Sequence, residues 1–362
     1  MRVAIDAREL GGHPTGVGRY LSGLLDAWAR SDSARRHHWT LITPSPIESS
    51  SRWHANVQIC AGSGGTAWEQ TTLPRAVRAA KADVFFAPGY TAPLTVAAPL
   101  VLTIHDVSFF AHPEWFSFRE GARRRWLSAW SARRARTVIT ISEFSKAEIK
   151  RFIGVEGDRI RVIPLGVAAP GARMPDAGPR APIVLYVGSI FQRRRVDRLI
   201  AAFDLAAEKV PAARLEIVGE NRTSPHVDIE ALRRQCRHAD RIAIRSYVDE
   251  AALAALYGRA SAFAFLSEYE GFGLTPLEAL AAGVPPMVLD TPIAREACGA
   301  GARYVSPSAA NEEIAGALVE LLTDDTARQH VLRHRNDVLL RYDWSVTAAS
   351  TLSVLEEAAG AR

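Results

Sequence analysis

Cysteine is scarce in this chain, with only three among 362 residues. Cys60, Cys236 and Cys298 stand far apart and lack the close spacing of metal ligands. The distribution argues against a disulfide framework and against a structural zinc site. We therefore expect three ordinary buried small residues.

Long apolar runs are also missing. No stretch approaches the roughly 20 residues that a membrane-spanning helix needs. The first residues, MRVAIDAREL, carry charges where a signal peptide would be apolar, so we expect a cytoplasmic protein. Since 48% of the residues are hydrophobic, the chain can bury a large core, and its length makes two domains the expected number.

Acidic residues are outnumbered, 39 against 44 basic ones. The densest basic segment, 118–136, holds seven arginines, two tryptophans and one acid, and it can be helical throughout. No zinc-finger spacing, heptad or RNA-binding aromatic signature accompanies it, so we expect no nucleic-acid partner. Two interpretations remain open. The segment is a solvated helix face, or it rests on an anionic membrane surface with Trp126 and Trp130 at the boundary.

Short apolar runs alternate with helical patterns along the chain, which predicts parallel, doubly wound sheets. A proline- and glycine-rich stretch at 166–182 predicts a linker. We therefore expect an α/β protein with Rossmann-like domains at 1–168 and 182–344, and a last helix within 345–362. The expected strands are 2–6, 39–43, 83–88, 99–106 and 137–142, then 183–189, 214–220, 241–247, 261–267, 284–290 and 302–307.

In open α/β sheets, ligands bind beyond the carboxyl ends of the strands. After the first strand, GGHPTGVGRY places Gly16 and Gly18 at a helix start, where free N–H groups suit an anion. The spacing lacks the third glycine of a dinucleotide fingerprint. His105 and Asp106 end another strand, and both a catalytic and a purely structural histidine are open there.

In the second half, YVGSIFQRRR turns at Gly188 and Ser189 and presents Arg193, Arg194 and Arg195 before a helix. Guanidinium groups there suit phosphate oxygens, and a merely solvated loop is the alternative.

The stretch EYEGFGLTPLEAL, residues 268–280, places two acids around a turn. Thr275 and Glu278 fit the N-cap and N3 positions of a capping box, with proline between them at the first helical position. Gly271 and Gly273 leave the helix N-terminus open to a diphosphate. Because Glu270 would weaken anion binding, we expect it to address sugar hydroxyls or developing positive charge.

EYEGFGLTPLEALAAGVPPMV resembles the double-glutamate motif of the retaining glycosyltransferases of family 4, which have the two-Rossmann GT-B fold. The resemblance covers almost the whole chain, since other segments agree in the same order. It implies a nucleotide-sugar bound mainly by the second half, an acceptor bound mainly by the first half, and catalysis in the interdomain cleft. It also implies that the last helix crosses back onto the first domain. The agreeing segments include GVGRY, TIHDVSFFAHPEWFS, ITISEFSKAEI, VIPLGV, VGSIFQRRRVDRLIAAF, SYVDEAALAALYGRA, PIAREACG and YDWSVTA.

By this resemblance Glu270 lies near the donor sugar and Glu278 holds the nucleotide ribose. His105, with Asp106 beside it, lies near the sugar and the acceptor. The expected donor-binding residues are Gly16, Gly18, Ser189, Arg193, Arg194, Gly271, Phe272, Gly273, Leu274 and Thr275. Two departures stand out: arginine replaces the usual lysine at Arg194, and Pro286 stands where a small aliphatic residue is usual.

The resemblance implies metal-independent hexosyl transfer with retention, and neither an Asp-x-Asp pair nor a carboxylate base is apparent in the sequence. A GDP-sugar carrying mannose or a 6-deoxyhexose is favoured over a UDP-sugar, with no other cofactor. The expected acceptor is a glycan or polyprenyl-diphosphate-linked saccharide of surface polysaccharide assembly. Three alternatives stay open: a nicotinamide dehydrogenase, a sugar-nucleotide epimerase and a non-enzymatic polysaccharide-binding subunit.

Overall fold

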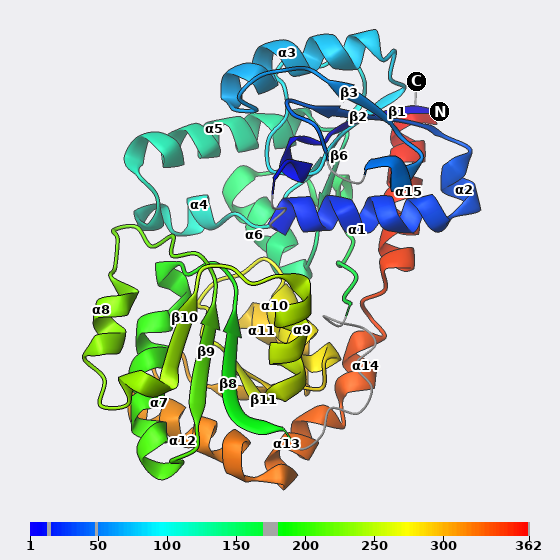
Figure 1. Ribbon diagram of the computed structural model, residues 1–362. Helices are drawn as coiled ribbons and strands as arrows, with labels where there is room; N and C mark the ends of the chain where they lie inside the picture. Colours follow the sequence, from blue (N-terminus) through cyan, green and yellow to red (C-terminus); the bar gives the residue numbers. More distant parts are fainter. Residues whose placement is uncertain (13–15, 48–49, 169–179, 361–362) are drawn as a thin grey trace. The chain divides into compact units, whose positions relative to one another are not determined.

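The chain forms two compact units, each with its own parallel sheet (Figure 1). The computed structural model describes residues 1–12, 16–47, 50–168 and 180–360. Unit 1 combines Met1–Gly166 with Tyr342–Arg362, and unit 2 is Val167–Arg341. Most of the predicted linker, residues 169–179, lies outside the described residues.

Over its described residues, unit 1 has a seven-stranded sheet in the order β3-β2-β1-β4-β5-β6-β7, with every pairing parallel. The two outermost strands were not predicted. No residue of β3 is fully buried, since its two end residues are exposed and its two middle residues are half-buried, and β7 has only three residues. Neither strand therefore shows a continuous apolar run. The strands are β1 Arg2–Asp6, β2 His38–Thr43, β3 Asn56–Ile59, β4 Val84–Ala87, β5 Leu100–Thr103, β6 Thr137–Thr140 and β7 Ile160–Val162.

Helices pack on both faces of this sheet. The helix α1 is amphipathic and buries Tyr20, Leu21, Leu24 and Trp28. The basic segment folds as the predicted helix, α5. The helices are α1 Gly16–Arg30, α2 Asp32–Arg35, α3 Thr66–Ala79, α4 Ser108–Ala111, α5 Phe118–Arg134, α6 Glu143–Ile153 and α15 Trp344–Gly360.

Unit 2 contains, among its described residues, a six-stranded parallel sheet in the order β10-β9-β8-β11-β12-β13. All six strands were predicted, because their buried positions give nearly continuous apolar runs. Pro286 begins β12, where proline is tolerated. The strands are β8 Ala181–Val187, β9 Arg214–Val218, β10 Ile242–Arg245, β11 Ala260–Phe265, β12 Pro286–Leu289 and β13 Arg303–Val305.

The helices of unit 2 follow its strands in a βαβ alternation. The long α7 and α12 lie together, with Arg198 of α7 donating to Asn311 of α12 at 3.1 Å. The helices are α7 Val196–Lys209, α8 Ile229–Arg234, α9 Glu250–Arg259, α10 Leu274–Ala281, α11 Pro292–Cys298, α12 Asn311–Thr323, α13 Asp325–Leu332 and α14 Arg335–Leu339.

The strand order reverses at one point in each sheet, between β1 and β4 in unit 1 and between β8 and β11 in unit 2. Loops that leave neighbouring strands on either side of such a reversal diverge and leave a crevice at the carboxyl ends. The segments with candidate site residues follow β1, β8 and β11, except that of His105 and Asp106, which follows β5, the neighbour of β4.

The last helix, α15, returns to unit 1 and packs against α1, as predicted (Figure 1). The indole N–H of Trp28 donates to the carbonyl of Ala348 at 2.9 Å, and the hydroxyl of Thr347 donates to Pro164 at 2.8 Å. At the start of α15, Trp344 lies directly against Gly23 of α1 and Gly166. The two glycines therefore make room for an indole ring.

This contact predicts opposite effects for two glycine-to-alanine changes in helices. In Gly23→Ala the new Cβ would lie 2.5 Å from the Trp344 ring. We expect the free energy of unfolding to fall by about 1–3 kcal/mol, because overpacking outweighs the gain in helix propensity. In the control, Gly316→Ala in α12, the Cβ meets nothing within 4 Å, and stability should rise by up to about 1 kcal/mol. Urea denaturation measures both, and a Gly23→Ala protein as stable as the control would contradict the packing.

Candidate functional site

Loops at the reversal point of the unit 2 sheet bring an arginine and a glutamate together. Arg194 follows β8 and Glu270 follows β11. The Arg194 Nε lies 2.8 Å from Oε1 of Glu270, although the residues are 76 positions apart in sequence. Their side chains are only 15% and 18% exposed. The pair is therefore a largely buried ion pair at the carboxyl edge of the sheet.

One oxygen of Glu270 is held firmly. Its Oε1 accepts hydrogen bonds from Arg194 and from the hydroxyl of Ser267 at 2.9 Å. Burial by itself would raise the pKa of Glu270, but the charges of Arg194 and Arg193 and the two hydrogen bonds lower it below its ordinary value. Glu270 is thus an oriented carboxylate and a weak base at neutral pH.

The three consecutive arginines have three different environments. Arg194 also donates to the carbonyl of Ser189 at 2.9 Å, while Arg193 stacks over the ring of Phe191 at 4.4 Å. Arg195 adopts a left-handed backbone with φ 45°, pairs with Glu268 and donates to Pro307 at 2.8 Å. The alternative of a solvated loop is therefore wrong for Arg194 and Arg195. Since Arg195 is committed to partners away from Glu270, Arg193 and Arg194 remain the phosphate candidates.

The predicted capping box is wrong. The helix α10 begins at Leu274, two positions earlier than expected, and its N-cap is Gly273 in a left-handed conformation with φ 94°. Glycine adopts this conformation without steric cost, and it has no side chain that could cap the helix. Thr275 is therefore inside the helix, and the backbone N–H groups of the first turn receive no capping side chain.

The shift in helix start changes the position of Glu278. It lies in the second turn of α10, where it is buried, rather than at the position that reaches back to an N-cap. Its structural role as a capping residue is thereby removed. Phe272 is also buried, so that residue can offer a ligand only its backbone.

In unit 1, His105 follows β5 and is buried. Its Nε2 lies 2.8 Å from the carbonyl oxygen of Pro88. Because a carbonyl only accepts, Nε2 carries the hydrogen and Nδ1 of the neutral ring is an acceptor. Burial lowers the pKa of His105, so the ring is neutral at pH 7. The edge of the ring packs against Tyr20, with the ring centroids 4.9 Å apart.

Asp106 is bound through both carboxylate oxygens. Oδ1 accepts the backbone N–H of Ser108 at 2.8 Å, and Oδ2 accepts the hydroxyl of Tyr90 at 3.0 Å. Tyr90, and Ser267 beside Glu270, were not predicted from the sequence. Neither belongs to a recognisable motif. The only signal for both is their position, just beyond the end of a buried strand.

The predicted glycines of unit 1 lie at the start of α1. Gly18 is buried, whereas Gly16 is exposed, and a Cβ added to Gly16 would meet nothing within 4 Å. Packing within the described residues therefore does not explain glycine at position 16. A closely approaching ligand backbone or phosphate would explain it.

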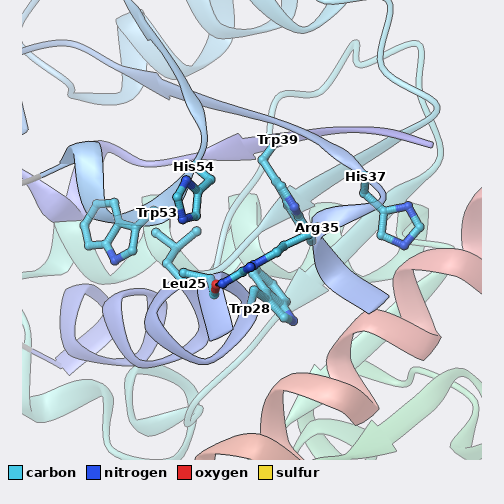
Figure 2. A pocket seen from close by; sticks show the side chains of 8 residues that line it. Leu25, Trp28, Arg35, His37, Trp39, Trp53 and His54 are labelled. Carbon is cyan, nitrogen blue, oxygen red and sulfur yellow. The ribbon is translucent and has the colours of Figure 1, made fainter. Parts of the chain in front are cut away.

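A cavity of about 270 Å³ in unit 1 contains none of these residues (Figure 2). It lies beside the start of β2, at the amino ends of the parallel strands, whereas His105 lies at their carboxyl ends. Trp28, Trp39 and Trp53 line it, but their indole N–H groups donate to Ala348, Ala34 and Asp26. The fold thus uses the three indole N–H groups, which are no longer free to orient a ligand.

Three further features bear on the predictions. Among the described residues, no three His, Cys, Asp or Glu side chains form a group that could hold a metal ion. No helix in the described ranges is long and apolar enough to cross a membrane. Cys298 is buried as expected, whereas Cys60 and Cys236 are only half-buried.

Two family models match the chain. Residues 14–169 match Glycosyltransferase Family 4, and residues 175–336 match Glycosyl transferases group 1. The glycogen synthase of Mycobacterium tuberculosis is 31% identical over 264 residues, which cover 71% of this chain and 62% of that protein. The chain thus spans less than two thirds of this relative. GDP-mannose:cellobiosyl-diphosphopolyprenol alpha-mannosyltransferase of Komagataeibacter xylinus is 30% identical over 275 residues, covering 71% and 67%.

Among solved structures, sucrose-phosphate synthase from Thermosynechococcus elongatus matches with a TM-score of 0.78 at 21% identity over 100% of both chains. This likeness confirms the predicted fold class. The chain belongs to the family 4 type of glycosyltransferases. Retention of configuration and the roles of the two glutamates stay predictions.

The buried ion pair predicts a pH-dependent effect of Glu270→Gln on stability. Because the folded pKa of Glu270 is lowered, its stabilising effect is present above the unfolded pKa of about 4.3 and is lost as pH falls through the folded pKa. We expect the variant to lose about 1–3 kcal/mol at pH 7, and the difference from the wild type to shrink below about pH 4.

Urea denaturation at pH 7 and pH 3.5 measures this difference. The control is Glu120→Gln in the surface pair with Arg124, whose side chains are 45% and 46% exposed, where a change within about 0.5 kcal/mol is expected. An equal loss at both pH values would show that Glu270 stabilises the fold through something other than its charge.

Proposed function

We propose that the chain transfers a hexose from a nucleotide-sugar to a glycan or lipid-linked acceptor, without a metal and with retention of configuration. The observation that carries this proposal is the Arg194–Glu270 ion pair at the reversal point of the unit 2 sheet. Glu270 lies in the same loop as the uncapped start of α10, and Arg194 comes from the loop after β8. Glycosyl transfer develops negative charge on the departing diphosphate and positive charge on the sugar. The arginine and the glutamate thus supply one opposite charge for each.

The first charge change is the negative charge on the departing diphosphate. The N–H groups at the start of α10 and the positive end of its dipole favour an anion there. Arg193 and Arg194 add guanidinium charge, and Arg194 is held in position by Glu270 and Ser189. Preorganised donors stabilise developing charge without reorganising at the moment of reaction. In the proposal, these groups stabilise the diphosphate charge that a metal ion would otherwise neutralise.

The second charge change is the positive charge that develops on the sugar. Oε2 of Glu270 is the oxygen that we assign to a sugar hydroxyl, because Oε1 is already occupied by Arg194 and Ser267. The lowered pKa keeps the carboxylate ionised and makes it a poor proton acceptor. Glu270 thus orients and stabilises the sugar rather than removing the acceptor proton.

In the proposed reaction, the bond from the anomeric carbon to the phosphate oxygen breaks while the acceptor oxygen bonds to the same face of that carbon. The acceptor proton passes to the departing phosphate oxygen. Glu278 holds the ribose, and Nδ1 of the neutral His105 accepts a hydrogen bond from a hydroxyl of the sugar or the acceptor.

A GDP-sugar is the proposed donor, with GDP-mannose first. The name of the Komagataeibacter xylinus relative, which contains both GDP-mannose and a polyprenyl-diphosphate acceptor, supports this choice. A UDP-sugar is the alternative donor. An epimerase would consume the donor without any acceptor, and a dehydrogenase would bind NAD instead.

Ligand-dependent melting tests the donor class. We expect GDP to raise the melting temperature, and to raise it equally with EDTA present, because a ligand selective for the native state stabilises it. UDP should give a smaller shift and NAD none. A shift with NAD alone would overturn the proposal, and a nucleotide shift abolished by EDTA would overturn its metal-free part.

Turnover tests the reaction. GDP-mannose with cellobiosyl-diphosphopolyprenol should yield GDP and a product that keeps the anomeric configuration, and Glu270→Gln should slow transfer by about 100-fold. The surface variant Glu120→Gln should match the wild type. A product of inverted configuration would contradict retention, and GDP-mannose consumed without GDP release would favour the epimerase.

We also propose that α5 rests on an anionic membrane surface. Phe118 is 85% exposed and Trp126 is 57% exposed, and the exposed Arg119 lies on the same helix face as Trp126. Arg123 is on this face too, and its guanidinium donates to the hydroxyl of Thr66. Arg125, by contrast, donates to the carbonyl of Phe109 and belongs to the fold. Exposed aromatic side chains beside arginines suit the boundary between headgroups and acyl chains.

Vesicle sedimentation tests this surface. The double variant Phe118→Ser with Trp126→Ser should bind phosphatidylglycerol vesicles about tenfold more weakly, and phosphatidylcholine vesicles should bind neither protein. The control is Val346→Ser, which removes a 63% exposed apolar side chain from α15. Unchanged binding of the double variant would exclude α5 as the membrane contact.

A further inference from the structure

Tyr90 has a backbone conformation that its side chain disfavours. Its φ is 57°, and over the described residues only three other non-glycine residues have positive φ: His54, Lys81 and Arg195. The left-handed region costs an ordinary residue roughly 1–2 kcal/mol. Such strain persists only where the surroundings enforce it, and it gathers at functional sites. Tyr90 follows β4, on one side of the reversal point of the unit 1 sheet.

Several hydrogen bonds enforce this turn. The backbone N–H of Tyr90 donates to Thr103 at 2.8 Å, and the hydroxyl of Thr91 donates to Oε1 of Glu69 at 2.6 Å. The backbone N–H of Ala92 donates to the buried hydroxyl of Ser131 at 3.0 Å. The turn is thus attached to β5, to α3 and to α5.

The anchor on α3 is itself fixed by charge. Glu69 is buried, and the same Oε1 that accepts Thr91 also accepts Arg8 at 2.7 Å. Arg8 in turn pairs with the buried Asp6 at the end of β1, at 2.6 Å. A network of buried charges therefore connects the end of β1 to the turn after β4. Breaking such a network is costly, so the turn has little freedom to relax.

The Tyr90 side chain contacts both His105 and Asp106. Its hydroxyl donates to Oδ2 of Asp106 at 3.0 Å, and its ring lies 5.6 Å from that of His105 between centroids. The ring also packs edge-on against Phe109 at 5.9 Å. Tyr90 and Tyr20 together contact the His105 imidazole.

We propose that Tyr90 is a positioning residue for transfer, and that its strained turn holds His105 and Asp106 in the orientation that receives the acceptor. This inference rests on the proposed function of His105. The hydroxyl fixes the Asp106 carboxylate and the ring fixes the imidazole plane. A misplacement of about 1 Å in such groups can cost about 100-fold in rate.

The test variant is Tyr90→Phe, which keeps the ring and removes the hydroxyl. With cellobiosyl-diphosphopolyprenol as the acceptor probe, we expect kcat/KM for the acceptor to fall about 10- to 100-fold. The KM for GDP-mannose should stay within about twofold, because most of the proposed donor groups, Arg194, Glu270 and Glu278 among them, lie in unit 2. Thr91→Val, which removes the anchor to Glu69, should change the acceptor kinetics in the same direction.

The matched control is Tyr304→Phe. It deletes a hydroxyl that donates to the carbonyls of Ala294 and Gly299 in unit 2. It should lower the melting temperature and leave the acceptor kinetics unchanged. If Tyr90→Phe behaved like this control, with lower stability and unchanged kcat/KM, Tyr90 would be a structural residue only.

A second measurement separates this inference from the proposed function. The imidazole signals of His105 can be followed by NMR through a pH titration whether or not the protein turns over a donor. We expect these signals and their titration midpoint to change in Tyr90→Phe and to stay unchanged in Tyr304→Phe. If the wild type transfers no sugar, the proposed function fails. If the His105 signals are the same in Tyr90→Phe and the wild type, the positioning role fails.

Discussion

Parallel strand pairing is the constraint on which the candidate site depends. In a parallel sheet every strand ends at the same edge, so the loops that carry chemistry gather there regardless of their distance in sequence. The reversal of strand order then selects which loops meet. Arg194 after β8 and Glu270 after β11 come within 2.8 Å because β8 and β11 are neighbours. The same rule places Tyr90 after β4 beside His105 after β5.

Buried charge is the second feature that the two units share. Each carboxyl edge carries a largely buried arginine paired with carboxylates: Arg194 with Glu270 in unit 2, and Arg8 with Asp6 and Glu69 in unit 1. Burying such pairs gains little stability, because the desolvation cost offsets much of the attraction. Their value lies in orientation, since a fixed ion pair holds the neighbouring polar groups in one arrangement. In unit 2 the pair itself is proposed to contact the donor, and in unit 1 it holds the turn of Tyr90, which contacts His105 and Asp106.

Much of the fold could be read from the sequence. The buried strands of unit 2 appear as apolar runs, and α5 and α15 appear as helical patterns, because local periodicity reports burial directly. The edge strands β3 and β7 were not predicted, because a strand at the edge of a sheet needs no continuous apolar run. The predicted start of α10 was two positions too late. Thr275, Pro276 and Glu278 fit a capping box locally, but the left-handed turn at Gly273 allows the helix to begin earlier.

By itself the sequence determined the fold class, the family and the identity of most candidate site residues, since these follow from periodicity and from motifs that lie within short segments. Only the tertiary structure decided how those residues are paired. It showed that Glu270 engages Arg194, which is 76 positions away, that Arg195 pairs with Glu268, and that Tyr90 contacts His105 and Asp106. These contacts join segments that leave different strands. Which residues pair there depends on the strand order and on the competition among buried charges. No single segment of the sequence reveals either of these.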